Sequence, residues 1–247
     1  MRIVAVYSIK GGVGKTASAV NLAYLSARDG YRTLIWDLDP QGAATYYFRV
    51  APGVKGGGKR LLAGKSDLDR LIRGSDYDRL DLLPSDFSYR KMDLVLGKQR
   101  KPNQRLAELL VPMEESYDYV FLDCPPNITL LSEGVFIAAD LLLVPTIPTT
   151  LSIRTLERLQ RHLRKKRYRG LRVLPFFCMV DRRKKLHRET VADPPPGLPG
   201  FLRTTIPFAS AVEKMGGYRA PLPHYEPSSP AARAYEYLWR EVQSTGE

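Results

Sequence analysis

Residues 8–16 read Ser-Ile-Lys-Gly-Gly-Val-Gly-Lys-Thr, and this stretch decides the fold that we expect. A short apolar, β-branched run precedes it at residues 3–7, and residues 17–27 follow with apolar side chains at helical spacing before Asp29-Gly30. The pattern predicts a buried strand, a glycine-rich loop and a helix that stops at a glycine. Such a loop wraps a phosphate chain, because backbone N–H groups and the positive end of a helix dipole meet there.

The loop carries each contact that the phosphates of a nucleotide need. Gly11, Gly12 and Gly14 let the backbone turn sharply and aim N–H groups inward. Lys15 is expected to reach the β- and γ-phosphates, and the Thr16 hydroxyl to ligate Mg²⁺. We therefore expect ATP and Mg²⁺ as cofactors. The loop residues predicted to bind the nucleotide are Lys10, Gly11, Gly12, Val13, Gly14, Lys15, Thr16 and Ala17.

Two further strand-like stretches end in carboxylates. Tyr119–Asp123 is apolar up to its final aspartate, and Thr33–Asp37 is followed at once by Leu38 and Asp39. An aspartate at a strand end is commonly structural, as a helix cap or loop residue. Beside a phosphate loop it can instead hold the metal shell. Two aspartates in alternation are better explained by metal and water positioning.

These motifs, in this order and spacing, resemble the ParA/Soj ATPases, which belong to the ParA/MinD group with the deviant Walker A phosphate loop. The motifs are Lys-Gly-Gly-Val-Gly-Lys-Thr at 10–16, Asp-Leu-Asp-Pro-Gln-Gly at 37–42 and Asp-Cys-Pro-Pro at 123–126. The resemblance continues through 144–148, 179–183, 205–207 and 230–235. It therefore predicts a single ATPase domain over residues 1–247.

The resemblance implies a role for each matching residue. Lys10 matches the signature lysine that reaches across a dimer interface to the nucleotide of the other subunit. Asp39 matches the residue that orients the attacking water, so the predicted catalytic residues are Lys10, Lys15 and Asp39. Asp123 matches the Walker B carboxylate, so the predicted metal ligands are Thr16, Asp37 and Asp123. Ala17 departs from the family, which usually has a threonine there that touches the α-phosphate.

Strand and helix patterns alternate along all 247 residues. Alternation of this kind predicts an α/β fold with a mostly parallel sheet that is covered by helices on both faces. Further strands are predicted at 80–84, 141–145, 172–180 and 201–206. Further helices are predicted at 66–73, 103–110, 132–139, 153–168 and 229–242. Loops are expected at 52–59, which is rich in Gly and Lys, and at the proline-rich 192–200.

The positive charge is concentrated in one part of the chain. The formal net charge is +12, and residues 154–188 alone reach that value with fourteen Lys or Arg against two acidic residues. At about 100° per residue, the helix predicted at 153–168 carries leucines on one face and Arg154, Arg158, Arg161 and Lys165 on the other. A second cluster follows at Arg182, Arg183, Lys184, Lys185 and Arg188.

This concentration predicts a surface for nonspecific binding of double-stranded DNA. An ordinary solvated helix face is the alternative. Pro207 and Phe208 follow a predicted strand at the edge where ligands of open α/β sheets bind, and they are candidates for contacting adenine or for plain packing.

The remaining features bear on location. No apolar run approaches the ~20 residues that span a membrane, and the N-terminal segment reads as a strand rather than a signal peptide. Cys124 and Cys178 are far apart, which fits a reducing cytoplasm and gives no metal or cluster framework. We expect a cytoplasmic protein that is associated with the nucleoid and does not bind membranes.

The leading hypothesis is a DNA-associated ATPase switch. It would be a homodimer when ATP is bound, and a ParB-like or cargo-adaptor protein would stimulate its slow hydrolysis. Its cargo would be a plasmid, a chromosome origin or a protein assembly. A MinD-type membrane-cycling ATPase is the second hypothesis, although the tail at 235–247 has three acids and one arginine where that branch needs a basic amphipathic anchor. A synthetase or small-molecule kinase is the third.

Overall fold

A seven-stranded sheet forms the centre of the computed structural model, which describes residues 1–65, 68–168, 170–198 and 200–245. The strand order is β3-β4-β2-β5-β1-β6-β7, and every pairing is parallel except that of β3 with β4. The strands are β1 (Arg2–Val6), β2 (Thr33–Asp37), β3 (Arg73–Gly74), β4 (Leu80–Leu83), β5 (Tyr119–Asp123), β6 (Leu141–Thr146) and β7 (Arg172–Phe177).

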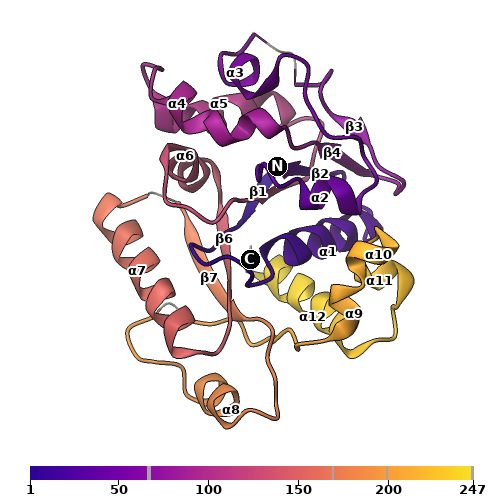
Figure 1. Cartoon of the computed structure of the whole chain (residues 1–247), viewed down its shortest axis with the longest axis vertical. Helices are drawn as coiled ribbons and strands as arrows, with labels where there is room; N and C mark the ends of the chain where they lie inside the picture. Colours follow the sequence, from indigo (N-terminus) through magenta and orange to yellow (C-terminus); the bar gives the residue numbers. More distant parts are fainter. Residues whose placement is uncertain (66–67, 169, 199, 246–247) are drawn as a thin grey trace.

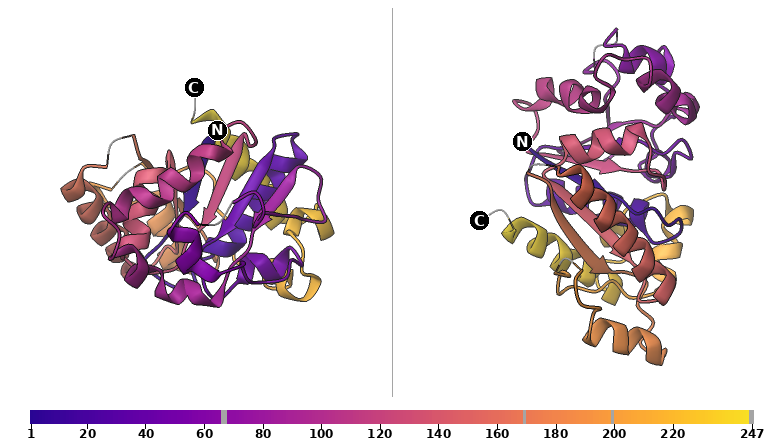
Figure 2. Two further views of the ribbon diagram at one scale, coloured as in Figure 1. Left: turned by 90° about the horizontal axis from the view of Figure 1, so that it is seen from above. Right: turned by 90° about the vertical axis from the view of Figure 1, so that its left-hand side faces the viewer.

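Helices cover both faces of this sheet, as Figures 1 and 2 show. The longer ones are α1 (Lys15–Arg28), α6 (Leu130–Ala138), α7 (Thr150–Lys166), α8 (Lys185–Ala192) and α12 (Pro230–Ser244). The shorter ones are α2 (Ala43–Tyr47), α3 (Gly57–Leu62), α4 (Met92–Leu96), α5 (Arg105–Leu110), α9 (Ser210–Glu213), α10 (Met215–Tyr218) and α11 (Leu222–Tyr225). The α/β fold with a mostly parallel sheet is confirmed.

Successive side chains along each strand point to opposite faces of the sheet, so the core has two layers. Phe121 of β5 faces α1 and α12, where it packs near Trp239, whereas its neighbour Leu122 faces the layer of α3 to α7. Both residues are fully buried. The central strands are therefore apolar on both sides, as parallel strands between two helix layers must be.

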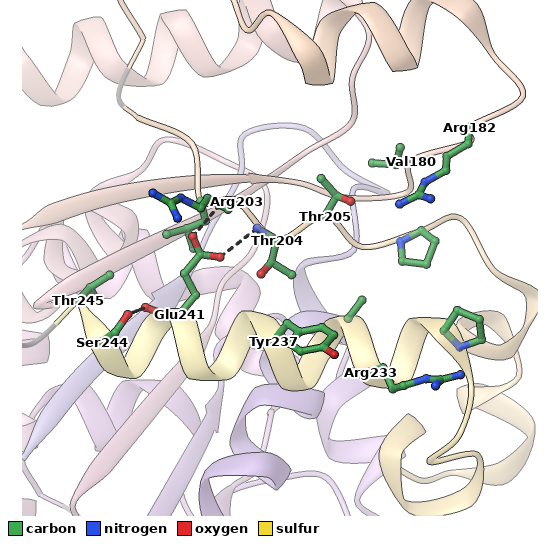
Figure 3. Close-up of a pocket in the computed structure, with 14 residues that line it drawn as sticks. Val180, Arg182, Arg203, Thr204, Thr205, Arg233, Tyr237, Glu241, Ser244 and Thr245 are labelled. Atoms are coloured by element: carbon green, nitrogen blue, oxygen red, sulfur yellow. Dashed lines mark hydrogen bonds between the residues drawn. The ribbon is translucent and has the colours of Figure 1, made fainter.

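The strand predicted at 201–206 is wrong. Leu202 N donates to Pro175 O at 2.8 Å and Ile206 N donates to Phe177 O at 2.9 Å, so the segment follows the edge of β7. Between these points, however, the Glu241 carboxylate of α12 accepts from the N–H groups of Arg203 and Thr204 at 2.6 and 2.9 Å (Figure 3). The side chain takes the place of a ladder partner, so no regular strand forms.

The helix predicted at 66–73 is also wrong in the part that can be assessed, since 66–67 lie outside the described residues. Residues 68–72 form one turn, with Leu71 N and Ile72 N both donating to Leu68 O. That single turn already buries Leu68 and Leu71, so the apolar spacing needs no longer helix. The loop expected at 52–59 is interrupted because α3 begins at Gly57.

The other predicted elements match the structure within a few residues, and the short helices α2, α4 and α9 to α11 were not predicted. No helix in the described part of the chain has the length and apolar character needed to cross a membrane.

Candidate functional site

The glycine-rich loop lies between β1 and α1, as the sequence predicts. Gly14 is the N-terminal cap of α1 and Gly12 lies two residues earlier, with φ of 90° and 68° respectively. Both values are in the left-handed region that favours glycine. At Gly14 a Cβ atom would come within 2.9 Å of Cys178 Sγ, so a side chain has no room there. The backbone therefore turns directly into the N-terminus of a fourteen-residue helix.

Lys15 points back into this loop. Its side chain is buried, and Nζ donates to the backbone oxygen of Lys10 at 3.4 Å. Burial lowers the pKa of the Lys15 ammonium, while the carboxylates of Asp123 and Asp39 act in the opposite direction. A cation held inside a loop of N–H donors is suited to a polyanionic ligand. Lys10 itself is half-buried at the loop entrance.

Asp37 and Asp123 end neighbouring strands and are directly paired in register. Both are fully buried. Neither carboxylate oxygen of Asp123 has a hydrogen-bond partner in the described part of the chain. Burial and then the charge of Asp37 raise the pKa of Asp123 well above its usual value, and the nearby Thr16 hydroxyl acts in the opposite direction. Burial likewise raises the pKa of Asp37 to about 6.

Two unpartnered buried carboxylate oxygens are costly unless a cation completes them. The residues present therefore fit Mg²⁺, which takes one or two carboxylates and a hydroxyl and draws its other ligands from phosphate and water. Within residues 1–65, 68–168, 170–198 and 200–245, no group of three or more His, Cys, Asp or Glu is placed to hold a metal ion.

Asp39 lies half-buried just beyond the end of β2. Its Oδ1 accepts from Gln41 N at 2.9 Å, and its backbone oxygen accepts from the Ser85 hydroxyl at 2.5 Å. Ser85 and Thr45, which contacts Asp37, were missed by sequence reasoning. The only local signal for Thr45 is a hydroxyl early in a helix after an aspartate motif, and nothing local marks Ser85.

Pro207 and Phe208 do lie next to the phosphate loop. With Gly12, Gly14 and Met179 they line a cavity of about 180 Å³, whose other walls are Cys178, Ile206, Ala209, Val212, Glu213 and Tyr235. Ligand sites are usually 300–1,000 Å³, so this cavity alone is smaller than a typical ligand site. A larger groove of about 1090 Å³ lies between residues 202–207 and α12 (Figure 3), and no phosphate-loop residue lines it.

The predicted basic helix face is present on α7. The leucines Leu156, Leu159 and Leu163 are buried. The basic side chains Arg154, Arg158, Arg161 and Lys165 are all exposed. The helix thus displays its charge as expected from its periodicity.

The second basic cluster is less free than the sequence indicates. Arg183 pairs with both carboxylate oxygens of Asp181, at 2.9 and 3.0 Å, and this pairing lowers the Asp181 pKa to about 2. Arg188 donates to the backbone oxygens of Arg182 and Arg183, and Lys185 lies 3.6 Å from Glu189. Part of this cluster therefore stabilises its own loop and α8.

The site is that of a P-loop ATPase of the ParA/MinD type. It combines a glycine-rich loop, a buried lysine and two aspartates that are paired at the ends of neighbouring strands. A family model described as AAA domain matches residues 1–171. The chromosome-partitioning ATPase Soj of Treponema pallidum is 30% identical over 241 residues, which cover 94% of this chain and 93% of Soj. The chain belongs to the ParA/Soj family of ATPases.

Solved structures share the fold. A putative plasmid partition protein from Borrelia burgdorferi bound to AMPPNP has a TM-score of 0.86 at 21% identity and covers 99% of each chain. Cobyrinic acid a,c-diamide synthase from Mycobacterium smegmatis, with bound ADP and magnesium, has a TM-score of 0.81 at 25% identity and covers 97% of this chain and 92% of the synthase.

Proposed function

We propose that this protein is an ATP-dependent, dimerising ATPase switch that binds DNA nonspecifically and partitions or positions a cargo. The cargo would be a plasmid, a chromosome origin or a protein assembly. The observation that carries the proposal is the fully buried Asp123, whose carboxylate has no hydrogen-bond partner among the described residues and which lies beside Asp37 and near the charge of Lys15. That arrangement is suited to a nucleotide that arrives with a divalent cation.

Within the site, the loop N–H groups and Lys15 would hold the β- and γ-phosphates, and Pro207 and Phe208 would contact adenine. Thr16, Asp37 and Asp123 would hold Mg²⁺, which supplies charge neutralisation of the phosphate oxygens when it is bound. Asp39 would orient the attacking water from its half-buried position at the end of β2. Hydrolysis would be slow without an activator, because phosphoryl transfer depends on positioning and charge stabilisation.

Lys10 would reach the nucleotide of a second copy, so ATP would bring two α7 helices into one assembly. Each α7 would contribute its exposed basic face, the residues Arg154, Arg158, Arg161 and Lys165. Contacts of this kind bind phosphates without reading sequence. Arg182 and Lys184 would add to this surface, whereas Arg183, Lys185 and Arg188 would contribute less. The protein would act in the cytoplasm on the nucleoid, with a ParB-like or cargo-adaptor activator.

The test is DNA binding as a function of nucleotide and salt. With a non-hydrolysable ATP analogue, affinity for an arbitrary duplex should fall steeply between 50 and 200 mM salt, with a log–log slope of about −0.9 per phosphate contacted. The double variant Arg154→Ala/Arg158→Ala should reduce that slope by about 2, while the exposed Lys91→Ala should not. DNA affinity that is the same with ATP analogue, with ADP and without nucleotide would contradict the proposal.

Liposome sedimentation distinguishes the proposed DNA-binding ATPase from a membrane-cycling ATPase. Tyr235 and Trp239 of α12 are buried in the core rather than free to enter a bilayer. Sedimentation with anionic liposomes in the presence of ATP should leave the protein in the supernatant, and nucleotide-dependent pelleting would favour a MinD-type cycle instead.

A further inference from the structure

Two buried hydroxyl residues connect the carboxylate of Asp37, the last residue of β2, with the backbone of Asp39. Thr45 of α2 is 1% exposed, and it donates to Asp37 Oδ2 from both its backbone N, at 2.8 Å, and its Oγ1, at 2.7 Å. Ser85, two residues after β4, is 2% exposed, and its backbone N donates to Thr45 Oγ1 at 2.9 Å. The Ser85 hydroxyl donates to the Asp39 backbone oxygen at 2.5 Å. One chain of hydrogen bonds therefore joins Asp37 to Asp39.

The donors and acceptors in this chain of hydrogen bonds can be assigned. A hydroxyl has one proton, and Ser85 N–H can only donate, so Thr45 Oγ1 accepts from Ser85 and its own proton goes to Asp37. Asp37 Oδ2 is thereby filled by two bonds. Among the described residues, its Oδ1 accepts a single hydrogen bond, from Asp39 N at 3.3 Å. The geometry thus leaves Oδ1 as the oxygen of Asp37 that remains available to another ligand.

We propose that Thr45 and Ser85 are positioning residues for the ATPase reaction. Thr45 fixes the carboxylate of Asp37 so that Oδ1 is presented to the metal shell, and Ser85 fixes the peptide that carries Asp39 toward the attacking water. The inference rests on the proposed function, because that function gives Asp37 and Asp39 their roles. The Thr45 hydroxyl is bonded to Asp37 and the Ser85 hydroxyl to the Asp39 backbone, so both would act through the aspartates.

A purely structural role predicts a different outcome. Thr45→Val keeps the side-chain volume and the backbone bond to Asp37 but removes the hydroxyl bond to Asp37. It also leaves the buried Ser85 N–H without its acceptor, so some loss of stability is expected in either case. The chain offers a matched control in Thr33 at the other end of β2. Thr33 is fully buried, and its hydroxyl bonds to Ser26 Oγ at 2.8 Å. Thr33→Val therefore removes a buried hydroxyl bond on the same strand but away from the site.

The test measures Mn²⁺ affinity of the full-length, ADP-bound protein by electron paramagnetic resonance, alongside thermal unfolding and steady-state ATP hydrolysis. Thr45→Val should weaken Mn²⁺ binding about tenfold, the equivalent of one charge-assisted hydrogen bond. Thr45→Ser should restore it, and Thr33→Val should leave it unchanged. Ser85→Ala, which keeps every backbone bond, should lower kcat about tenfold at unchanged KM and unchanged Mn²⁺ affinity, since only the Asp39 peptide is released.

Equal Mn²⁺ affinities for Thr45→Val and Thr33→Val at equal loss of thermal stability would overturn the role of Thr45. A wild-type kcat in Ser85→Ala would overturn the role of Ser85, and this variant carries the test if Thr45→Val does not fold. Wild-type protein that binds neither nucleotide nor Mn²⁺ would sink the proposed function as well, so the two failures are distinguishable.

Discussion

Replacement of single glycines in the phosphate loop should produce three different stability losses, because the three glycines meet different constraints. Gly11 has no left-handed φ, and a Cβ there would meet nothing within 4 Å. Gly12 has φ of 68° but also open space. Gly14 has φ of 90°, and its Cβ would lie 2.9 Å from Cys178 Sγ. The series Gly11→Ala, Gly12→Ala and Gly14→Ala therefore adds one penalty at a time.

The expected magnitudes follow from these constraints. Gly11→Ala should change the free energy of unfolding by less than about 0.5 kcal/mol. Gly12→Ala should cost about 1–2 kcal/mol, the price of a left-handed conformation for an L-residue. Gly14→Ala should cost that amount plus about 1–3 kcal/mol for overpacking against the buried Cys178. Removing Sγ with Cys178→Ala should recover only the second part in the double variant.

The assay is urea unfolding of the nucleotide-free protein at constant pH, with a double-mutant cycle over Gly14 and Cys178. The midpoint of thermal unfolding gives a second measure, at about 2–4 °C per kcal/mol for a chain of this size. Equal losses for Gly12→Ala and Gly14→Ala, together with no coupling to Cys178→Ala, would refute the reasoning. The close approach of the loop to β7 would then not constrain Gly14.

Further predictions concern the carboxylates and the signature lysine. Asp39→Ala should accumulate as an ATP-bound dimer that stays on DNA, which size-exclusion chromatography and DNA retention would show; rapid hydrolysis by this variant would remove Asp39 from its role. Lys10→Ala should abolish ATP-dependent dimerisation in the same column assay while mant-ATP fluorescence still reports binding. Because burial raises the folded-state pKa of Asp37 to about 6, the metal-free protein should lose stability as pH rises from about 4 to about 6. In chemical unfolding, Asp37→Asn should weaken this dependence, while the part that comes from Asp123, whose pKa burial also raises, should remain. Glu241→Ala should lower the free energy of unfolding by about 1–3 kcal/mol, since the N–H groups of Arg203 and Thr204 lose their acceptor; a thermal midpoint equal to wild type would argue against this.

The elements that the sequence predicted well are those whose signal is local. The strands β1, β2 and β5 are mainly apolar runs, and α7 alternates leucines and basic residues with helical period. Each of these elements can therefore be predicted from its own residues, without information about the segments that pack against it. The phosphate loop is equally local, because its glycines, lysine and threonine are consecutive. These segments gave the fold class and most of the candidate site.

What the sequence could not show depends on residues distant in the chain. The segment 201–206 has the composition of a strand, but Glu241 from α12 takes two of its N–H groups. Thr45 and Ser85 are 40 positions apart in the sequence, and nothing local marks either one. Only the folded structure brings them into one hydrogen-bond chain. Side-chain acceptors supplied by tertiary contacts have no local period, so pattern reasoning does not find them.

The two basic regions differ in how much of their charge is already paired within the protein. Formal charge treats α7 and the cluster at 182–188 alike, but the structure does not, because Asp181 compensates Arg183 and Glu189 lies near Lys185. The α7 residues Arg154, Arg158 and Arg161 have no comparable acid among their described contacts. Counterion release requires cations that a phosphate can neutralise without first displacing a protein carboxylate. The salt dependence of DNA binding should therefore follow substitutions on α7 more closely than substitutions of Arg183, although the two regions carry similar numbers of basic residues.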